Sequence, residues 1–414
     1  QTKIDYKPNI YNTFSILVIA GGSLYDRDKK GALDVGESEY GELKNNQLTL
    51  GINYKKIWNE KAYSNTSLSI SNKYSKVNFS NINTDSLVFK NIEEGDIFNF
   101  RQINHIKIAS QTNLEFGFDA QWTTQNYDYL RKLNDGDILL DEIKFDQKVS
   151  ISNYSAFFTV KKNLGRKLIS SIGLRTDLND YENTTLISPR INLDYEIVNS
   201  KTNLIFNMGD YYQNPPAIYV ANKTSDRLKS ARARQYSLCL EHMITASTKF
   251  SVSAYQKDYN NSPILPNSNL HNDPTFLFDE LRMYNGIVSE GSASSKGLEV
   301  LIQKKRVENF YGLIGGSIFN STFIDFEGIE RNRNHNYRHI FNIVGGYRPK
   351  SDWELSIRWS YFGGRPYTPI NLEASISNNE QYSYVENFNE SKTPDYHSLF
   401  VRYERRYNLK KSNL

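Results

Sequence analysis

The chain has 414 residues, a near balance of 50 basic and 46 acidic side chains, and a formal net charge of +4. Its mean hydropathy is −0.61 and no apolar run approaches the roughly twenty residues of a membrane helix, so a helical membrane protein is excluded. Basic residues are not clustered as a nucleic-acid footprint requires, so we expect no nucleic-acid partner.

Alternating apolar and polar residues recur in long segments through the whole chain. Because successive side chains of a strand point to opposite faces, this alternation predicts strands with one apolar and one polar face. We predict about sixteen strands, near residues 13–27, 45–58, 62–76, 97–109, 111–127, 143–162, 166–179, 188–198, 201–212, 230–244, 248–260, 293–306, 309–325, 337–348, 352–364 and 394–408.

The clearest strand has a wholly apolar face, Trp353, Leu355, Ile357, Trp359 and Tyr361, interleaved with polar residues. A soluble β-sandwich rarely needs so many long two-faced strands, so we predict an all-β fold, a transmembrane antiparallel up-and-down β-barrel with apolar residues toward lipid. The 13% aromatic content suits the girdles at membrane interfaces. Eight charged residues would face the lumen: Glu115, Asp119, Arg190, Asp194, Glu241, Glu299, Glu354 and Arg358.

The joints between predicted strands alternate between short and long. Short periplasmic turns and longer extracellular loops are typical of such barrels, so the first predicted strand, 13–27, should run outward. The expected long loops are residues 28–44, 77–96, 128–142, 213–229, 261–292, 326–336 and 365–393.

The ends of the sequence indicate a piece of a longer protein. The first ten residues lack the features of a secretory signal, so Gln1 either follows a removed signal or lies inside a longer chain. After the last predicted strand, residues 408–412 resemble a periplasmic turn, and no terminal aromatic strand follows. Since lipid tolerates no open sheet edge, we predict a single outer-membrane β-barrel domain over 1–414, truncated at both ends.

Several local motifs resemble those of one known family. They are Gly363-Gly364-Arg365-Pro366-Tyr367-Thr368-Pro369, Ser295-Lys296-Gly297-Leu298-Glu299, Tyr211-Tyr212-Gln213-Asn214-Pro215-Pro216, Ser188-Pro189-Arg190 and Thr393-Pro394-Asp395-Tyr396-His397-Ser398-Leu399. In this order and spacing, the chain resembles the barrel domain of TonB-dependent outer-membrane receptors of the Bacteroidetes type.

The resemblance implies a barrel of twenty-two strands, an N-terminal plug domain and a TonB energy-coupling complex in a Gram-negative outer membrane. About four strands and the plug would then precede this sequence, and two strands would follow it. The lumen residues would hold the plug, and the receptor would actively import a scarce metal chelate (such as a siderophore), cobalamin or glycan. One departure is Phe400, where the family often has Asp, which questions the face assignment of the last strand.

The residues leave one other function class open and argue against a second. A passive porin is the alternative, because about sixteen strands could close alone into a diffusion channel. A membrane-embedded hydrolase would need an ordered catalytic group, and we find none, so no enzyme activity or cofactor is expected. His335 and His339 would be too far apart on a strand to share a metal ion. We assign residues 134–142 to a solvated loop rather than a calcium site, and Cys239 and Arg365 to structural roles.

Overall fold

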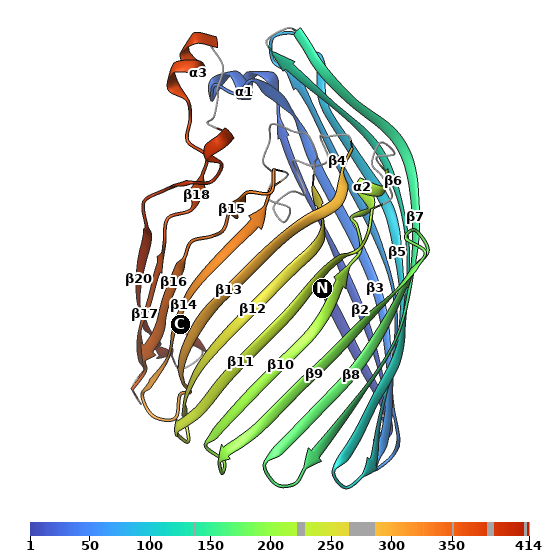
Figure 1. Cartoon of the computed structure of the whole chain (residues 1–414), viewed down its shortest axis with the longest axis vertical. Coiled ribbons are helices and arrows are strands. Elements are labelled where there is room, and N and C mark those ends of the chain that lie inside the picture. The colour runs from blue at the N-terminus through green and yellow to red at the C-terminus, as the bar shows by residue number, and fades with distance from the viewer. Residues whose placement is uncertain are drawn as a thin grey trace.

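The computed structural model describes residues 1–135, 138–221, 228–264, 286–325, 327–349, 352–378, 385–409 and 412–413. Its main feature is an 18-stranded sheet. Each long strand pairs antiparallel with the next long strand in the chain, which makes a meander. Figure 1 shows that the sheet curves into a tall wall of tilted strands.

The strands in chain order are β1 (Thr2–Asn9), β2 (Asn12–Arg27), β3 (Glu39–Asn59), β4 (Ala62–Asn81), β5 (Leu87–Ala109), β6 (Thr112–Asp135), β7 (Ile138–Leu164), β8 (Leu168–Asn179), β9 (Thr184–Val198), β10 (Thr202–Gln213), β11 (Ala231–Thr245), β12 (Thr248–Ile264), β13 (Val288–Lys304), β14 (Phe310–Ile324), β15 (Glu330–Asn332), β16 (His339–Tyr347), β17 (Trp353–Phe362) and β20 (Tyr396–Arg405). Four two-residue strands lie outside this sheet: β18 (Pro366–Tyr367), β19 (Ser391–Lys392), β21 (Asn408–Leu409) and β22 (Ser412–Asn413). The helices are α1 (Lys29–Asp34), α2 (Ala217–Ala221), α3 (Leu372–Asn378) and the 3-10 turn η2 (Val385–Asn387).

All sixteen predicted strands correspond to observed ones, but the first strand was missed. The sheet begins with β1, which pairs with β2 and runs opposite to it. The strand predicted as the first, 13–27, is therefore the second strand of the sheet, and the outward direction expected for it stays a prediction. The eight residues of β1 alternate only briefly before Pro8, which left too short a pattern to detect.

Two predicted long loops, 77–96 and 128–142, are instead largely strand, and the last six residues of a third, 28–44, belong to β3. β3 begins at Glu39, only residues 82–86 separate β4 from β5, and β6 and β7 extend to Asp135 and from Ile138. These extensions rise above the rest of the wall (Figure 1). Residues 87–96 and 128–135 show no regular apolar–polar alternation, so the sequence pattern did not carry these strands to their full length.

The two edges of the sheet have no strand partner in the described part of the chain. β1 pairs only with β2, and β20 pairs only with β17. The short turns gather at one end of the wall, and the longer connections gather at the other with α1 and α3 (Figure 1). None of the helices within the described ranges has the length and apolar character of a membrane span.

Candidate functional site: the polar concave wall

The eight charged residues predicted to face the lumen share one face of the sheet. Directly opposed residues of antiparallel strands lie on the same face. One row joins Glu115 through Thr159 and Gly173 to Arg190, and another joins Asp194 through Ile205, Cys239 and Ser253 to Glu299. Asp119, Glu241, Glu354 and Arg358 lie an even number of residues along their strands from members of these rows or from their register partners, so they are on the same face.

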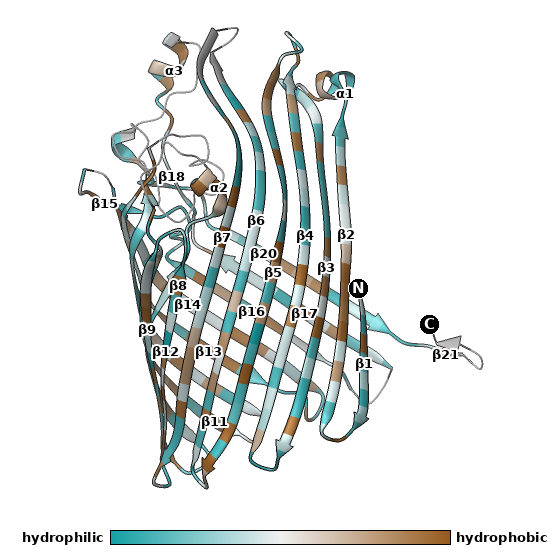
Figure 2. Ribbon diagram, turned by 90° about the vertical axis from the view of Figure 1, so that its right-hand side faces the viewer, coloured by the Kyte–Doolittle hydropathy of each residue, from teal (hydrophilic) through white to brown (hydrophobic). Residues whose placement is uncertain are grey.

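This polar face is the concave one. The Asn214 amide, beyond the end of β10, donates a 2.6 Å hydrogen bond to Asn153 Oδ1 on β7. Two strands lie between β7 and β10, and only the inside of a curved sheet brings such positions together. The opposite face carries exposed apolar side chains such as Leu50, Phe118 and Ile357. Figure 2 shows this alternation as brown and teal bands along the strands.

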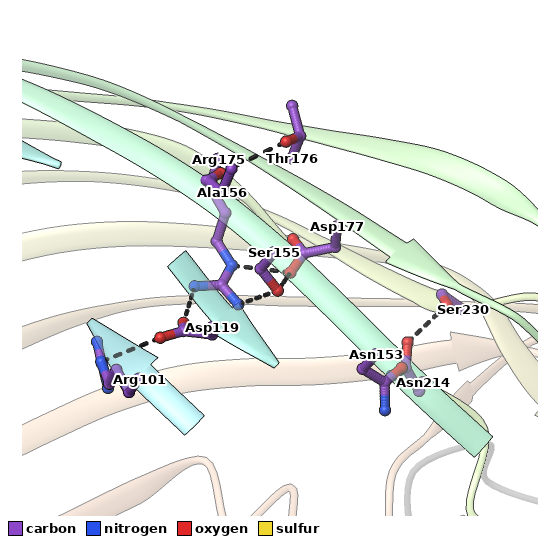
Figure 3. A network of polar contacts seen from close by, with 10 residues as sticks. All are labelled: Arg101, Asp119, Asn153, Ser155, Ala156, Arg175, Thr176, Asp177, Asn214 and Ser230. Atoms are coloured by element: carbon purple, nitrogen blue, oxygen red, sulfur yellow. Dashed lines mark hydrogen bonds and ion pairs between the residues drawn. The ribbon is translucent and has the colours of Figure 1, made fainter. Parts of the chain in front are cut away.

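A charged network lies on the concave face across β5 to β8 (Figure 3). The Arg175 guanidinium donates through Nη1 to Asp119 and through Nε to Asp177, both at 2.8 Å, and through Nη2 to Ser155 Oγ at 2.7 Å. Arg101 Nε lies 3.2 Å from the other Asp119 oxygen, at ion-pair distance. The network borders a hollow of about 510 Å³. The positive charges of two guanidinium groups here balance the negative charges of two carboxylates. The Arg101 side chain remains exposed toward the interior of the wall.

The other predicted lumen residues are partnered locally and do not form one cluster. Glu241 accepts from Lys249 at 2.8 Å, Asp194 accepts from Asn203 at 2.8 Å, and Glu354 accepts from the Tyr311 hydroxyl. The Arg190 and Arg358 guanidinium groups lie over the rings of Tyr211 and Phe400, at 4.6 and 4.7 Å. Glu115 lies 3.3 Å from His105, and Glu299 faces Ser253 and Ser317 across neighbouring strands.

Phe400 therefore lies on the concave face, where the departure from the family pattern had questioned the assignment of the last strand. Its register partner is Arg358. An aromatic ring under a guanidinium supplies a cation–π contact where an acid would supply an ion pair.

Sequence reasoning missed Arg175, Asp177 and Arg101, although their segments were predicted as strands. The alternation rule places all three on the polar face, and that signal was available. Their convergence on Asp119 depends on the register of three strand pairs, which the sequence does not specify.

The mouth of the concave face holds a small apolar core. Ile218, Tyr219 and Ala221 of α2 are buried in one cluster with Tyr127, Tyr129, Val149 and Ile151 of β6 and β7. Pro216 O accepts the backbone N–H of Tyr219, which starts the helix. The connection after β10 thus folds inward over the wall rather than outward.

Two further connections at this end are held together by buried polar groups. Arg331 Nε donates to Asp325 Oδ2 at 2.5 Å, and Arg331 Nη1 donates to Glu386 O at 2.6 Å. The side chains of Asp325 and Arg331 are 0% and 5% exposed. The Asn389 amide adds a 2.9 Å bond to Asn332 O. The chain between β14 and β16 and the chain between β17 and β20 therefore form one unit.

The described residues contain no group of three His, Cys, Asp or Glu side chains placed to hold a metal ion. His339 begins β16, and its Nε2 lies 3.5 Å from Asp395. Cys239 is a free thiol on the concave face. Of the run considered for calcium, residues 136 and 137 lie outside the described residues.

The family model described as "TonB dependent receptor-like, beta-barrel" matches residues 3–413. The chain belongs to this family. Its members are outer-membrane transport receptors of Gram-negative bacteria and are not enzymes, so the barrel wall lies in that membrane. A search of curated protein sequences found no match.

Solved structures agree on the fold. The outer membrane transporter YddB from Escherichia coli is 11% identical with a TM-score of 0.68, and the match covers 97% of this chain and 61% of that chain. The ferripyoverdine receptor of the outer membrane of Pseudomonas aeruginosa is 11% identical with a TM-score of 0.70, and the match covers 99% of this chain and 58% of that chain. The copper transporter OprC is 12% identical with a TM-score of 0.70, and the match covers 98% of this chain and 64% of that chain. The chain spans about three fifths of the length of the structures that it matches first.

Four of the five family motifs in this chain contact one another in two pairs. In the first pair, Gly364 N–H donates to Asp395 Oδ1 at 2.9 Å, and Tyr361 OH donates to Asp395 Oδ2 at 2.6 Å. Arg365 and Thr393 exchange further bonds, which lead into the β18–β19 pair. In the second pair, the Arg190–Tyr211 contact joins the motifs at 188–190 and 211–216. These motifs fix where long connections rejoin the wall.

Proposed function

We propose that this chain is the barrel wall of an active outer-membrane importer for a scarce nutrient, a metal chelate, cobalamin or a glycan. The family match over residues 3–413 carries the proposal. The matched structures include a ferric citrate transporter, a ferripyoverdine receptor and a copper transporter, which support a metal chelate as the first class to test. The Bacteroidetes-type lineage remains part of the proposal, on the motifs alone.

In this proposal a plug domain fills the concave side and the TonB energy complex drives its rearrangement. The polar rows of the wall supply its contacts: Glu115, Asp119, Arg190, Asp194, Glu241, Glu299, Glu354 and Arg358. The exposed donors of Arg101 beside Asp119 are a further point of attachment. A polar interior surface with locally balanced charge suits a domain that must shift during each transport cycle, because no single buried pair has to break at high cost.

We further propose that additional strands cover the two free edges of this truncated barrel domain. A lipid-exposed edge leaves backbone groups without partners, so β1 and β20 each need a neighbour. A total of twenty-two strands then leaves three strands before β1 and two after β20. β1 takes the place of one of the four strands that the sequence had assigned to the preceding segment.

The test is uptake by a strain that lacks the full-length gene, complemented with that gene. Labelled ferric chelates, cobalamin and oligosaccharides are offered one at a time, with and without dissipation of the inner-membrane proton gradient. We expect one class to require both the gene and the gradient. Gene-dependent uptake that continues unchanged without the gradient would identify a passive porin instead.

A further inference from the structure

Four cations project from the outer face of the wall near its short turns: Lys56 on β3, Lys162 on β7, Lys304 on β13 and Arg405 on β20. Their registers place them on the apolar face, Lys304 in line with Val300 and Ile302 and Arg405 opposite Trp353. Lys56 lies 4.1 Å over the ring of Trp58, which is 59% exposed. We refer to these four cations as the basic girdle.

The basic girdle has no acidic neighbour among the outward strand positions that the structure describes near the short turns. In the described strands, the outward positions next to the short turns include no Asp or Glu. Within the described residues, none of the four cations forms an ion pair. A ring of unpaired charge beside apolar wall needs anions from outside the chain.

The opposite end of the same outer face differs. There the outward cations Lys76 and Lys90 pair with Glu42 and Asp128. These two cations at the far end therefore have acidic partners on the same outer face, which the four cations of the basic girdle lack.

The position of the girdle identifies the anion. Short turns are periplasmic in this architecture, so the girdle lies at the level of the inner-leaflet headgroups. Trp58, Phe310, Tyr347 and Trp353 occupy the same outward band, as interfacial aromatic residues do. The cations belong to β3, β7, β13 and β20, which are spread around the wall (Figure 1). One compact protein partner would not contact all four, whereas the lipid that surrounds a barrel would.

We propose that the basic girdle binds the phosphates of anionic phospholipids in the inner leaflet of the outer membrane. The long side chains extend from the apolar wall toward the headgroups, and each exposed cation near an anionic surface favours binding by about fivefold. This inference rests on the orientation of the barrel in the membrane and is independent of what the receptor transports.

The test uses the full-length receptor in phosphatidylcholine bilayers with trace spin-labelled phosphatidylglycerol or phosphatidylcholine. The motionally restricted spectral fraction gives the relative association constant of each lipid with the protein. We expect a ratio above 1 for phosphatidylglycerol at low salt, reduced toward 1 in about 1 M salt, where charge is screened within about 3 Å. The variant Lys56→Gln, Lys162→Gln, Lys304→Gln, Arg405→Gln should give a ratio near 1 at low salt.

A matched variant keeps the test specific: Lys44→Gln, Lys76→Gln, Lys144→Gln and Lys148→Gln remove four outward cations from the extensions of β3, β4 and β7. Lys44 lies fifteen residues from the end of β3, about 38 Å above the turn for a tilted strand, beyond the hydrocarbon. This variant should keep the wild-type ratio. An unchanged ratio in the girdle variant, or an equal loss in the matched variant, overturns the proposal. If the girdle variant does not fold, the double variant Lys162→Gln, Arg405→Gln, at exposed positions, replaces it. This double variant must halve the amount by which the phosphatidylglycerol ratio exceeds 1. Lys→Arg replacements in the girdle, which keep the charge, must leave that ratio unchanged.

Discussion

At the scale of single residues, glycine positions decide how the long connections rejoin the wall. A Cβ on Gly364 would lie 1.8 Å from Thr393 O, and one on Gly363 would lie 2.0 Å from Tyr337 O. Both neighbours are backbone atoms, which cannot turn away as a side chain can. The paired glycines of the motif are therefore required by close backbone approach rather than by ligand contact.

We expect Gly364→Ala to destabilise the β18–β19 region by about 1–3 kcal/mol, the usual cost of forcing an extra methyl group into a packed site. The measurement is urea unfolding of the refolded barrel, followed by electrophoretic mobility with and without heating. Gly21→Ala is the matched control, because a Cβ there meets nothing within 4 Å. Equal midpoints for the two variants would refute the steric argument.

The sequence identified these glycine motifs but not their contacts. Gly364 and Asp395 are 31 residues apart, and alternation within each strand carries no information about which connections meet. Recognition of the motif at 363–369 and of the motif at 393–399 came from resemblance, and their mutual hydrogen bonds are seen only in the fold.

At the scale of elements, the tip of the β4–β5 hairpin holds α1 in place. Lys29 Nζ donates to Asp85 Oδ1 at 2.7 Å, and Tyr40 OH donates to the same oxygen at 3.1 Å. The Lys29 ammonium, followed by the Tyr40 hydroxyl, holds the pKa of the Asp85 carboxyl below its ordinary value of 3.8. A lowered carboxyl pKa stabilises the fold above the ordinary value, and this contribution disappears as the pH falls through the lowered value.

We therefore expect Asp85→Asn to increase hydrogen exchange of residues 28–40 at about pH 6, with no difference from wild type at pH values below the lowered pKa. Asparagine tolerates the φ of 56° at this position, so the backbone is preserved. Asp34→Asn, an exposed carboxyl of α1, serves as control. A difference between Asp85→Asn and wild type that persists unchanged into strong acid would show that the effect is not electrostatic.

The apolar core at the mouth gives a second test at this scale. Tyr219 is 3% exposed and packs α2 against β6 and β7. Truncation of a large buried ring costs about 3–5 kcal/mol, so Tyr219→Ala should release α2 while the strands stay paired. Protease cleavage of the connection after β10 should become faster, with cleavage elsewhere unchanged. Ile376→Ala on α3, which is 80% exposed, should behave as wild type, and resistance of the Tyr219 variant would contradict the packing.

Elements were predictable where one face of a strand meets lipid and the other meets water. Residues 353–361 show this directly, and β17 spans Trp353–Phe362. The same rule misassigned residues 77–81 and 87–96 to a loop, since residues 87–96 show no regular apolar–polar alternation. The inward fold of α2 left no signal, since its five residues are too few to show a helical period.

At the scale of the whole molecule, one alternation rule unites the features of the wall. The outward set carries the apolar residues and the basic girdle. The inward set carries the charged network around Arg175 (Figure 3). Both follow from placing the same sheet between hydrocarbon and a polar interior. Family membership places the wall in the outer membrane, and solved structures share its fold.

The most direct test of this claim is the environment of spin labels on single cysteines, introduced with Cys239→Ser into the receptor in bilayers. Outward positions Leu50, Phe118 and Ile357 are compared with inward positions Asn53, Gln121 and Ser356. We expect labels at the first three to be accessible to oxygen dissolved in lipid, and labels at the other three to be shielded from it. Equal oxygen accessibility at the two sets of positions would contradict a wall that separates lipid from a polar interior.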